Sequence, residues 1–345
     1  MRAERLNFSV LGKVSITHDE ANKAVKTSLY GLAGREARYI EGRGCVLIND
    51  SGKPLPPAVD LPKPALSQVA GDLPLRPDSA TMSGVDQDRL NAAVDFGMQA
   101  VNGGAAHGIV ILRDGKLLVE KYAAGINADT RLLGWSMTKS ITGALLGMRI
   151  AEGKIKLNET PVFREWIGSP DHADPRAEIP LLSLLRMNSG LKWEESYGSV
   201  TDATIMLHDQ YDMAGYARKQ AATSPPSTSW AYSSGTSNLL MDEIRRSFSS
   251  DEQLTAWMHN SLFNAIGANS FIIESDQSGL PVGSSYGWAR ARDWAKMGQL
   301  FLNKGNWQGK QIIPAEWINT MLEPAAGSDN LYGGQIWLKG PDTPS

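Results

Sequence analysis

The chain has little cysteine, little histidine and no long hydrophobic run, and each absence excludes a class of protein. Of its 345 residues, one is a cysteine and five are histidines. The single Cys45 excludes an internal disulfide and a metal cluster built from several thiolates. Because Cys45 lies in the apolar segment 44–48, we expect it to be a small residue of a strand.

Long apolar segments are also missing. None approaches the about 18 residues of a membrane-spanning helix, and the first residues lack the apolar core of a signal peptide. We therefore expect no membrane segment. The default location is the cytoplasm, or outside it if a leader is missing from this sequence.

The histidines and the net charge exclude further functions. His18, His107, His172, His208 and His259 are scattered without a His-x-x-x-His pair, so they predict no zinc site. Each is expected to be a surface or loop residue. The formal net charge of -3 gives no reason to expect nucleic acid or an acidic membrane as a partner. We expect no metal and no cofactor.

The composition, 42% hydrophobic and 21% charged, is that of a globular protein with room for two lobes. The first part predicts a short strand, a helix near 19–32, a strand at 45–48, a proline-rich connector over 51–77, a helix opening at 83–86 and a β-hairpin of 108–113 with 116–122. Later patterns predict helices at 180–187, 201–207, 213–220, 238–248, 254–265, 289–303 and 314–322, and a strand at 332–338. This order favours a mixed lobe interrupted by an all-helical one.

One stretch combines an apolar helix with a lone charge. Residues 136–139 read Ser-Met-Thr-Lys and open a largely apolar helix that carries no other charge before Arg149. Residues three apart on a helix share a face, so Ser136 and Lys139 should point into the same space. A hydroxyl beside a desolvated lysine is a serine nucleophile that needs no histidine. The alternative is a helix-capping serine followed by a lysine that reaches out to water.

A second Ser-x-x-Lys, Ser189 with Lys192, follows an apolar run that Ser189-Gly190 should terminate. These two side chains would then lie in a loop with no fixed geometry. The hydroxyl-rich segment 225–238 contains Tyr232, which is either a buried aromatic with a satisfied hydroxyl or, beside a lysine, a proton relay.

Together, Ser136-Met137-Thr138-Lys139 and Tyr232-Ser233-Ser234 resemble the motifs of the serine β-lactamase and penicillin-binding-protein superfamily. The closest resemblance is to its class C-like hydrolases, the family VIII carboxylesterases and 6-aminohexanoate-dimer hydrolases. The stretches 184–191, 232–238 and 291–299 agree, and the similarity runs from about residue 85 to 338.

The resemblance implies an α/β plus all-α fold, with an antiparallel sheet flanked by helices and a helical second lobe. The expected division is an N-terminal extension and connector at 1–83, an α/β lobe at 84–135 and 281–345, and a helical lobe at 136–280 that carries both motifs.

The resemblance also implies roles for residues. Ser136 would form an acyl-enzyme, with Lys139 and Tyr232 as the base and proton-transfer pair; which of the two takes the serine proton stays open. Tyr197 resembles a substrate-contacting tyrosine of the 6-aminohexanoate-dimer hydrolases, although an ordinary loop aromatic is an interpretation at least as well supported. Ser234 is expected at the substrate as well, where the β-lactamase pattern Tyr-x-Asn has its asparagine.

The sequence departs from the family's motifs in two places. A serine hydroxyl bonds differently from an asparagine amide and reaches less far, which favours a general esterase or amidase over a dedicated β-lactamase. The family's third motif, Lys/His-Ser/Thr-Gly on a late strand, has no convincing match before Ser345. In the family that strand supplies one oxyanion-hole N–H and the nucleophile's own N–H supplies the other. We therefore expect a chain truncated before this strand, with weak activity or none.

The sequence thus predicts a serine hydrolase that cleaves a small-molecule ester or amide through Ser136. The alternatives are a β-lactamase or D-Ala-D-Ala peptidase, and an inactive binding module of the same fold. An α/β-hydrolase is excluded, because the Gly-x-Ser-x-Gly at 283–287 follows a loop and no histidine comes after it.

Overall fold

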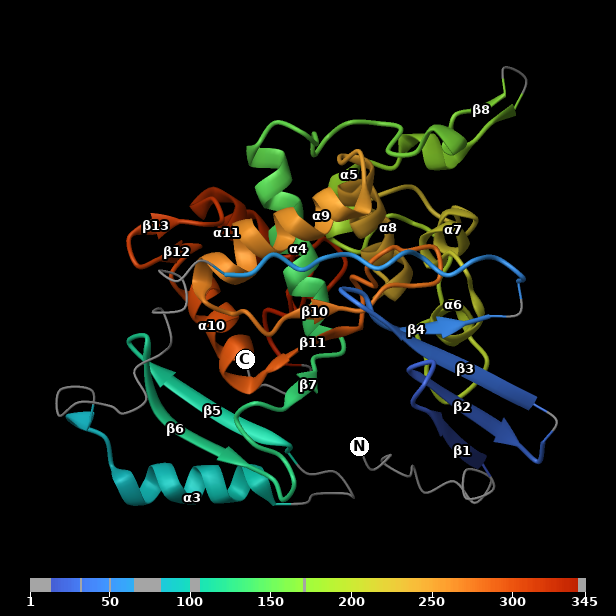
Figure 1. The fold of residues 1–345 in the computed structure, drawn as a ribbon. Helices are drawn as coiled ribbons and strands as arrows, with labels where there is room; N and C mark the ends of the chain where they lie inside the picture. The colour runs from blue at the N-terminus through green and yellow to red at the C-terminus, as the bar shows by residue number, and fades with distance from the viewer. Residues whose placement is uncertain are drawn as a thin grey trace.

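The computed structural model describes residues 14–31, 33–49, 51–64, 82–99, 106–169 and 172–340. Its centre is a long apolar helix, α4 (Met137–Ala151), which crosses the molecule in Figure 1. From Ile141 to Arg149 every residue of α4 is buried. The helix can be approached closely because it carries glycines: the Trp317 indole N–H donates to the Gly143 carbonyl at 2.9 Å.

Helices surround α4 and share one hydrophobic core with it. They are α5 (Leu181–Leu185), α6 (Asp202–Asp209), α7 (Met213–Arg218), α8 (Ser234–Arg246), α9 (Asp251–Met258), α10 (Ala291–Leu302) and α11 (Ala315–Leu322), with a π-helical turn, η4 (His259–Phe263), after α9 and single 3-10 turns η2 (Arg164–Trp166), η3 (Pro175–Glu178) and η5 (Asn264–Ile266). Helix α8 packs against α4, α5 and α7, and α11 against α4. These contacts fix the first turns of α4 and α8 side by side, which brings the two sequence motifs together.

Short antiparallel sheets make up the rest. Strand β7 (Arg131–Leu133) pairs with β11 (Gly287–Arg290), which pairs with β10 (Ile272–Ile273). The hairpin β5 (Gly108–Arg113) and β6 (Lys116–Tyr122) lies beside α3 (Gln87–Met98), as Figure 1 shows. Two small hairpins complete the set, β8 (Gly168–Ser169) with β9 (His172–Ala173) and β12 (Asn306–Trp307) with β13 (Lys310–Gln311). The structure has the mixed fold that the sequence predicts, antiparallel strands with a large helical part.

The N-terminal part corrects one prediction. The expected helix near 19–32 is wrong, because this segment forms a hairpin of β1 (Val14–Asp19) and β2 (Ala24–Leu29). It continues through β3 (Ala33–Ile40) to β4 (Gly44–Ile48) as a four-stranded meander. Alternating Val, Ile and Thr favour a strand over a helix, and Lys23 turns the chain at a φ of 49°. The predicted strand at 45–48 is confirmed, although Cys45 in it is exposed.

The proline-rich connector is extended over residues 51–64 and crosses the helices in Figure 1; the remainder, to residue 77, lies outside the described residues. Backbone carbonyls hold it in place: Pro57 accepts from Arg43, Pro62 from Asn264 and Lys53 from Gln277.

Two further predictions are wrong. The expected strand at 332–338 is a turn closed by an isolated bridge between Tyr332 and Trp337, with Gln335 at a φ of 62°. A left-handed residue cannot continue a strand. His259, expected on the surface or in a loop, is buried in η4, and burial lowers its pKa to about 4. No helix among the described residues is long and apolar enough to cross a membrane.

Candidate active site

A sharp turn between β7 and α4 presents Ser136. Strand β7 ends at Leu133, and Trp135 then adopts a φ of 43°, which is uncommon for a residue with a side chain. The carbonyl of Gly287 on β11 accepts from the Gly134 N–H at 2.8 Å, and the Gly287 N–H donates to Thr138 at 2.9 Å. Strand β11 therefore holds both sides of the turn. Ser136 is half-buried and makes no side-chain capping bond, so its hydroxyl is not used to cap α4.

Lys139 lies one turn further on, with only 1% of its surface exposed. Its Nζ atom is 3.4 Å from the Ser136 Oγ, 2.9 Å from the Ser234 Oγ and 2.9 Å from the Ser284 carbonyl oxygen. The alternative of a lysine reaching out to water is therefore wrong. Burial lowers the pKa of Lys139 to about 8, against the opposing effect of the Glu195 carboxylate.

Tyr232 arrives from the loop before α8 and stacks against the lysine. The Lys139 Nζ lies 5.0 Å from the centre of the Tyr232 ring. Burial raises the pKa of the Tyr232 phenol, while its hydrogen bonds with the Ser136 hydroxyl and the Trp337 indole act in the opposite direction. The aromatic rings of Tyr332 and Trp337 pack against it at 5.6 and 5.3 Å. The structure thus brings Ser136, Lys139 and Tyr232 into mutual contact.

Ser234 opens helix α8 and is fully buried. Besides the bond from Lys139, its hydroxyl donates to a Glu195 carboxylate oxygen at 2.5 Å. Tyr197, with 57% of its surface exposed, donates to the same carboxylate at 2.5 Å and lies 3.5 Å from Ser234. Tyr197 thus borders the site, whereas the burial of Ser234 favours a role toward Lys139 over direct contact with a substrate.

Sequence reasoning missed two groups in this site, the Glu195 carboxylate and the Ser284 carbonyl. Glu195 lies two residues before Tyr197, but no spacing rule connects that loop with the first turn of α8. Ser284 lies in the Gly-x-Ser-x-Gly sequence at 283–287, which does not mark an α/β-hydrolase nucleophile here. Its backbone is held in place by the Asn238 side chain, which accepts from the Ser284 N–H at 3.1 Å.

The second Ser-x-x-Lys lies in a loop, as the sequence predicts. Helix α5 ends at Leu185, Gly190 has a φ of 78°, and Lys192 is exposed. Among the described residues no group of three or more His, Cys, Asp or Glu side chains could hold a metal ion.

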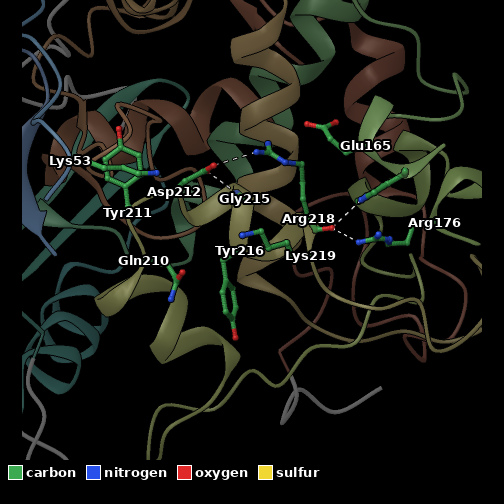
Figure 2. A pocket seen from close by; sticks show the side chains of 11 residues that line it. Lys53, Glu165, Arg176, Gln210, Tyr211, Asp212, Gly215, Tyr216, Arg218 and Lys219 are labelled. Carbon is green, nitrogen blue, oxygen red and sulfur yellow. Dashed lines mark hydrogen bonds and ion pairs between the residues drawn. The ribbon is translucent and has the colours of Figure 1, made fainter. Parts of the chain in front are cut away.

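Several cavities of the described residues lie outside this constellation, and two of them border the helical part. One, of about 250 Å³, is lined among others by Trp193, Trp230 and Ser233 and so lies directly behind the Tyr232 loop. The other, of about 420 Å³, is drawn in Figure 2 along α7. Its Arg218 is already paired with Asp212, as Figure 2 shows. Neither Ser136 nor Lys139 lines either cavity.

Comparisons with known proteins bear on the family and the fold of the chain. The family model described as Beta-lactamase matches residues 90–330. The 6-aminohexanoate-dimer hydrolase of Paenarthrobacter ureafaciens is 26% identical over 236 residues, which are 64% of this chain and 57% of that protein. The chain thus spans little more than half the length of this curated relative.

Solved structures show the same fold. A putative 6-aminohexanoate-dimer hydrolase from Bacillus anthracis superposes with a TM-score of 0.60 and 20% identity, over 80% of this chain and 76% of that one. A D-stereospecific amidohydrolase from a Streptomyces species superposes with a TM-score of 0.52 and 21% identity, over 75% and 82%. Because the family model covers more than half of its length, the chain belongs to the beta-lactamase family.

Proposed function

We propose that this protein is a serine hydrolase that cleaves small ester or amide bonds through an acyl-enzyme on Ser136. The observation that carries the proposal is the contact of the Ser136 hydroxyl with a lysine from which water is almost wholly excluded. Such a lysine loses its proton easily and can then activate a hydroxyl. The relative from Paenarthrobacter ureafaciens is named a 6-aminohexanoate-dimer hydrolase, which supports hydrolysis as the reaction class.

Lys139 is the better base of the two candidates. Burial lowers its pKa to about 8, which makes the neutral amine accessible near physiological pH. Burial raises the pKa of Tyr232, which keeps the phenol protonated. We therefore assign the serine proton to Lys139, and to Tyr232 the transfer of a proton toward the leaving group.

The reaction then balances in two steps. The Ser136 oxygen bonds to the substrate carbonyl carbon while its proton passes to Lys139. The bond to the leaving alcohol or amine breaks, and that group leaves with a proton supplied through Tyr232, which Lys139 restores. Water next attacks the acyl carbon, returns a proton to the serine oxygen through the same groups and releases the acid. We assign to the Ser136 N–H, at the positive end of α4, the stabilisation of the carbonyl oxygen as negative charge develops on it.

An ester or amide substrate is favoured over a β-lactam. The third position of the Tyr-Ser-Ser motif offers a buried hydroxyl already bonded to Lys139 and Glu195, rather than an amide that could donate to the substrate. Tyr197 is exposed beside Ser234 and is proposed to contact the substrate. The division into an α/β lobe, 84–135 with 281–345, and a helical lobe, 136–280, remains our proposal for how the site is framed.

The test uses a covalent fluorophosphonate probe and a short-chain p-nitrophenyl ester. We expect labelling and hydrolysis in the wild type and neither in Ser136→Ala. The matched control is Ser189→Ala, in the second Ser-x-x-Lys, which should keep both. A folded protein that takes no label would support the inactive binding module instead, and hydrolysis of a chromogenic cephalosporin faster than of the ester would favour a β-lactamase.

A further inference from the structure

The carboxylate of Glu195 collects four donors at the first turn of α8. One oxygen accepts from the hydroxyls of Ser234 and Tyr197, each at 2.5 Å. The other accepts from the Ser234 backbone N–H at 2.8 Å and the Trp193 indole at 2.6 Å. A carboxylate accepts but does not donate when ionised, so all four partners must donate to it.

This arrangement decides where the hydrogen of Ser234 points. A serine hydroxyl has a single proton to donate. Because that proton goes to Glu195, the Ser234 oxygen can only accept from Lys139, 2.9 Å away. The Ser284 carbonyl, also 2.9 Å from Lys139, can likewise only accept.

The consequence appears when Lys139 loses a proton. A protonated lysine has three N–H donors, which match its three neighbours, the oxygens of Ser136, Ser234 and Ser284. The neutral amine has two N–H donors and one lone pair. Two of the three neighbours cannot donate to the lone pair, so of these contacts only Ser136 can give it a proton.

We propose that Glu195 is a positioning residue: by holding the proton of the Ser234 hydroxyl, it leaves Ser136 as the one neighbouring hydroxyl that can donate to neutral Lys139. The inference rests on the proposed function, since it concerns how that nucleophile is activated. Without Glu195 the Ser234 hydroxyl is free to rotate and to donate to the amine itself, in competition with Ser136. Because Glu195 binds its proton, the Ser234 hydroxyl acts only as an acceptor toward Lys139. The carbonyl oxygen of an asparagine at position 234 would accept from Lys139 without the help of a second residue.

The test compares Glu195→Gln with Glu194→Gln, its exposed neighbour, whose loss should change nothing. The readout is the second-order rate of Ser136 labelling by the fluorophosphonate between pH 6 and 10. We expect the plateau rate to fall about tenfold or more in Glu195→Gln, a part of the 10²–10⁴ that a well-placed base contributes. The control variant should follow the wild type at every pH.

The pH profile separates positioning from mere support of the fold. Glu195 is the charge that holds up the pKa of Lys139, whose other neighbours are hydroxyls, a carbonyl and the Tyr232 ring. Its neutralisation should therefore move the midpoint of the profile to lower pH. Glu195→Asp keeps the charge but is one methylene shorter, so it should lower the plateau and leave the midpoint in place. This second variant also serves if Glu195→Gln fails to fold.

A double-mutant cycle with Ser234→Ala tests whether Glu195 acts through the Ser234 hydroxyl. If Glu195 acts through the Ser234 hydroxyl, Glu195→Gln should lower the plateau far less when that hydroxyl is already absent. Equal losses in both backgrounds would overturn the inference, as would a wild-type rate in Glu195→Gln and Glu195→Asp. Absence of label on the wild type would overturn the acyl-enzyme proposal itself, which is a different result.

Discussion

The Nζ atom of Lys139 lies 3.4 Å from the Oγ atom of Ser136, on a face of α4 that is sealed by Ser284 and by α8. An amine so placed serves catalysis only when it is neutral, because an ammonium has no lone pair to accept the serine proton. The protonation of one buried lysine therefore controls the site.

The first prediction concerns pH. The pKa of Lys139 is lowered to about 8, so at pH values below 8 the lysine is increasingly protonated and cannot act as the base. We expect kcat/KM for a p-nitrophenyl ester to fall about tenfold per pH unit below this midpoint and to level off above it. A rate profile measured from pH 6 to 10 checks this, and a midpoint near pH 6 or lower would contradict the role of Lys139.

The second prediction removes the base. Lys139→Ala should lower kcat/KM about 10²–10⁴-fold, the contribution of a positioned base. Lys192→Ala, in the exposed second Ser-x-x-Lys, is the matched control and should leave the rate within about twofold, since surface substitutions rarely disturb a fold. Similar rates in the two variants would refute the assignment.

A third prediction separates the phenol of Tyr232 from its ring. Tyr232→Phe keeps the packing against Tyr332 and Trp337 but removes the hydroxyl that contacts Ser136, so kcat should fall about 10²-fold or more. Its control is Tyr332→Phe. The Tyr332 hydroxyl is buried without a hydrogen-bond partner among the described residues, so its loss should not lower the thermal midpoint. Stopped-flow rates and thermal melting distinguish the two.

The helices and the two motifs could be predicted from the sequence, because hydrophobic periodicity and helix caps depend only on residues that are close together in the chain. The hairpin at 108–122 was readable for the same reason: Asp114 and Gly115, both at positive φ, make the tight turn that their sequence predicts. The helix predicted for segment 19–32 was wrong because the order of its polar and apolar residues fits a helix almost as well as a strand. The pairing of this segment with β3 stabilises the strand.

The site was only partly predictable from the sequence. The shared helix face made the pairing of Ser136 with Lys139 predictable. The contacts of Lys139 with Ser234 and Ser284 span 95 and 145 residues, and they exist only because α8 and the turn before β11 pack on α4. No local sequence pattern predicts the role of Glu195. A carboxylate in a loop is expected to be exposed to water, and only the tertiary structure brings its hydrogen-bond donors together.

The last prediction tests the packing that holds α4 in place. A Cβ atom on Gly147 would lie 2.0 Å from the Trp317 ring, so Gly147→Ala should lower the free energy of unfolding by about 1–3 kcal/mol through overpacking. Gly298, in α10, is exposed, and a Cβ atom there would meet no heavy atom within 4 Å beyond its chain neighbours and the backbone of its own helix. Gly298→Ala should therefore raise the free energy of unfolding by about 0.5–1 kcal/mol through helix propensity alone. Urea unfolding of the two variants measures whether the free energy of unfolding falls in Gly147→Ala and rises in Gly298→Ala. Stabilisation by Gly147→Ala would mean that Trp317 does not lie against α4, and the position of the Ser136 turn at the head of that helix would then need another support.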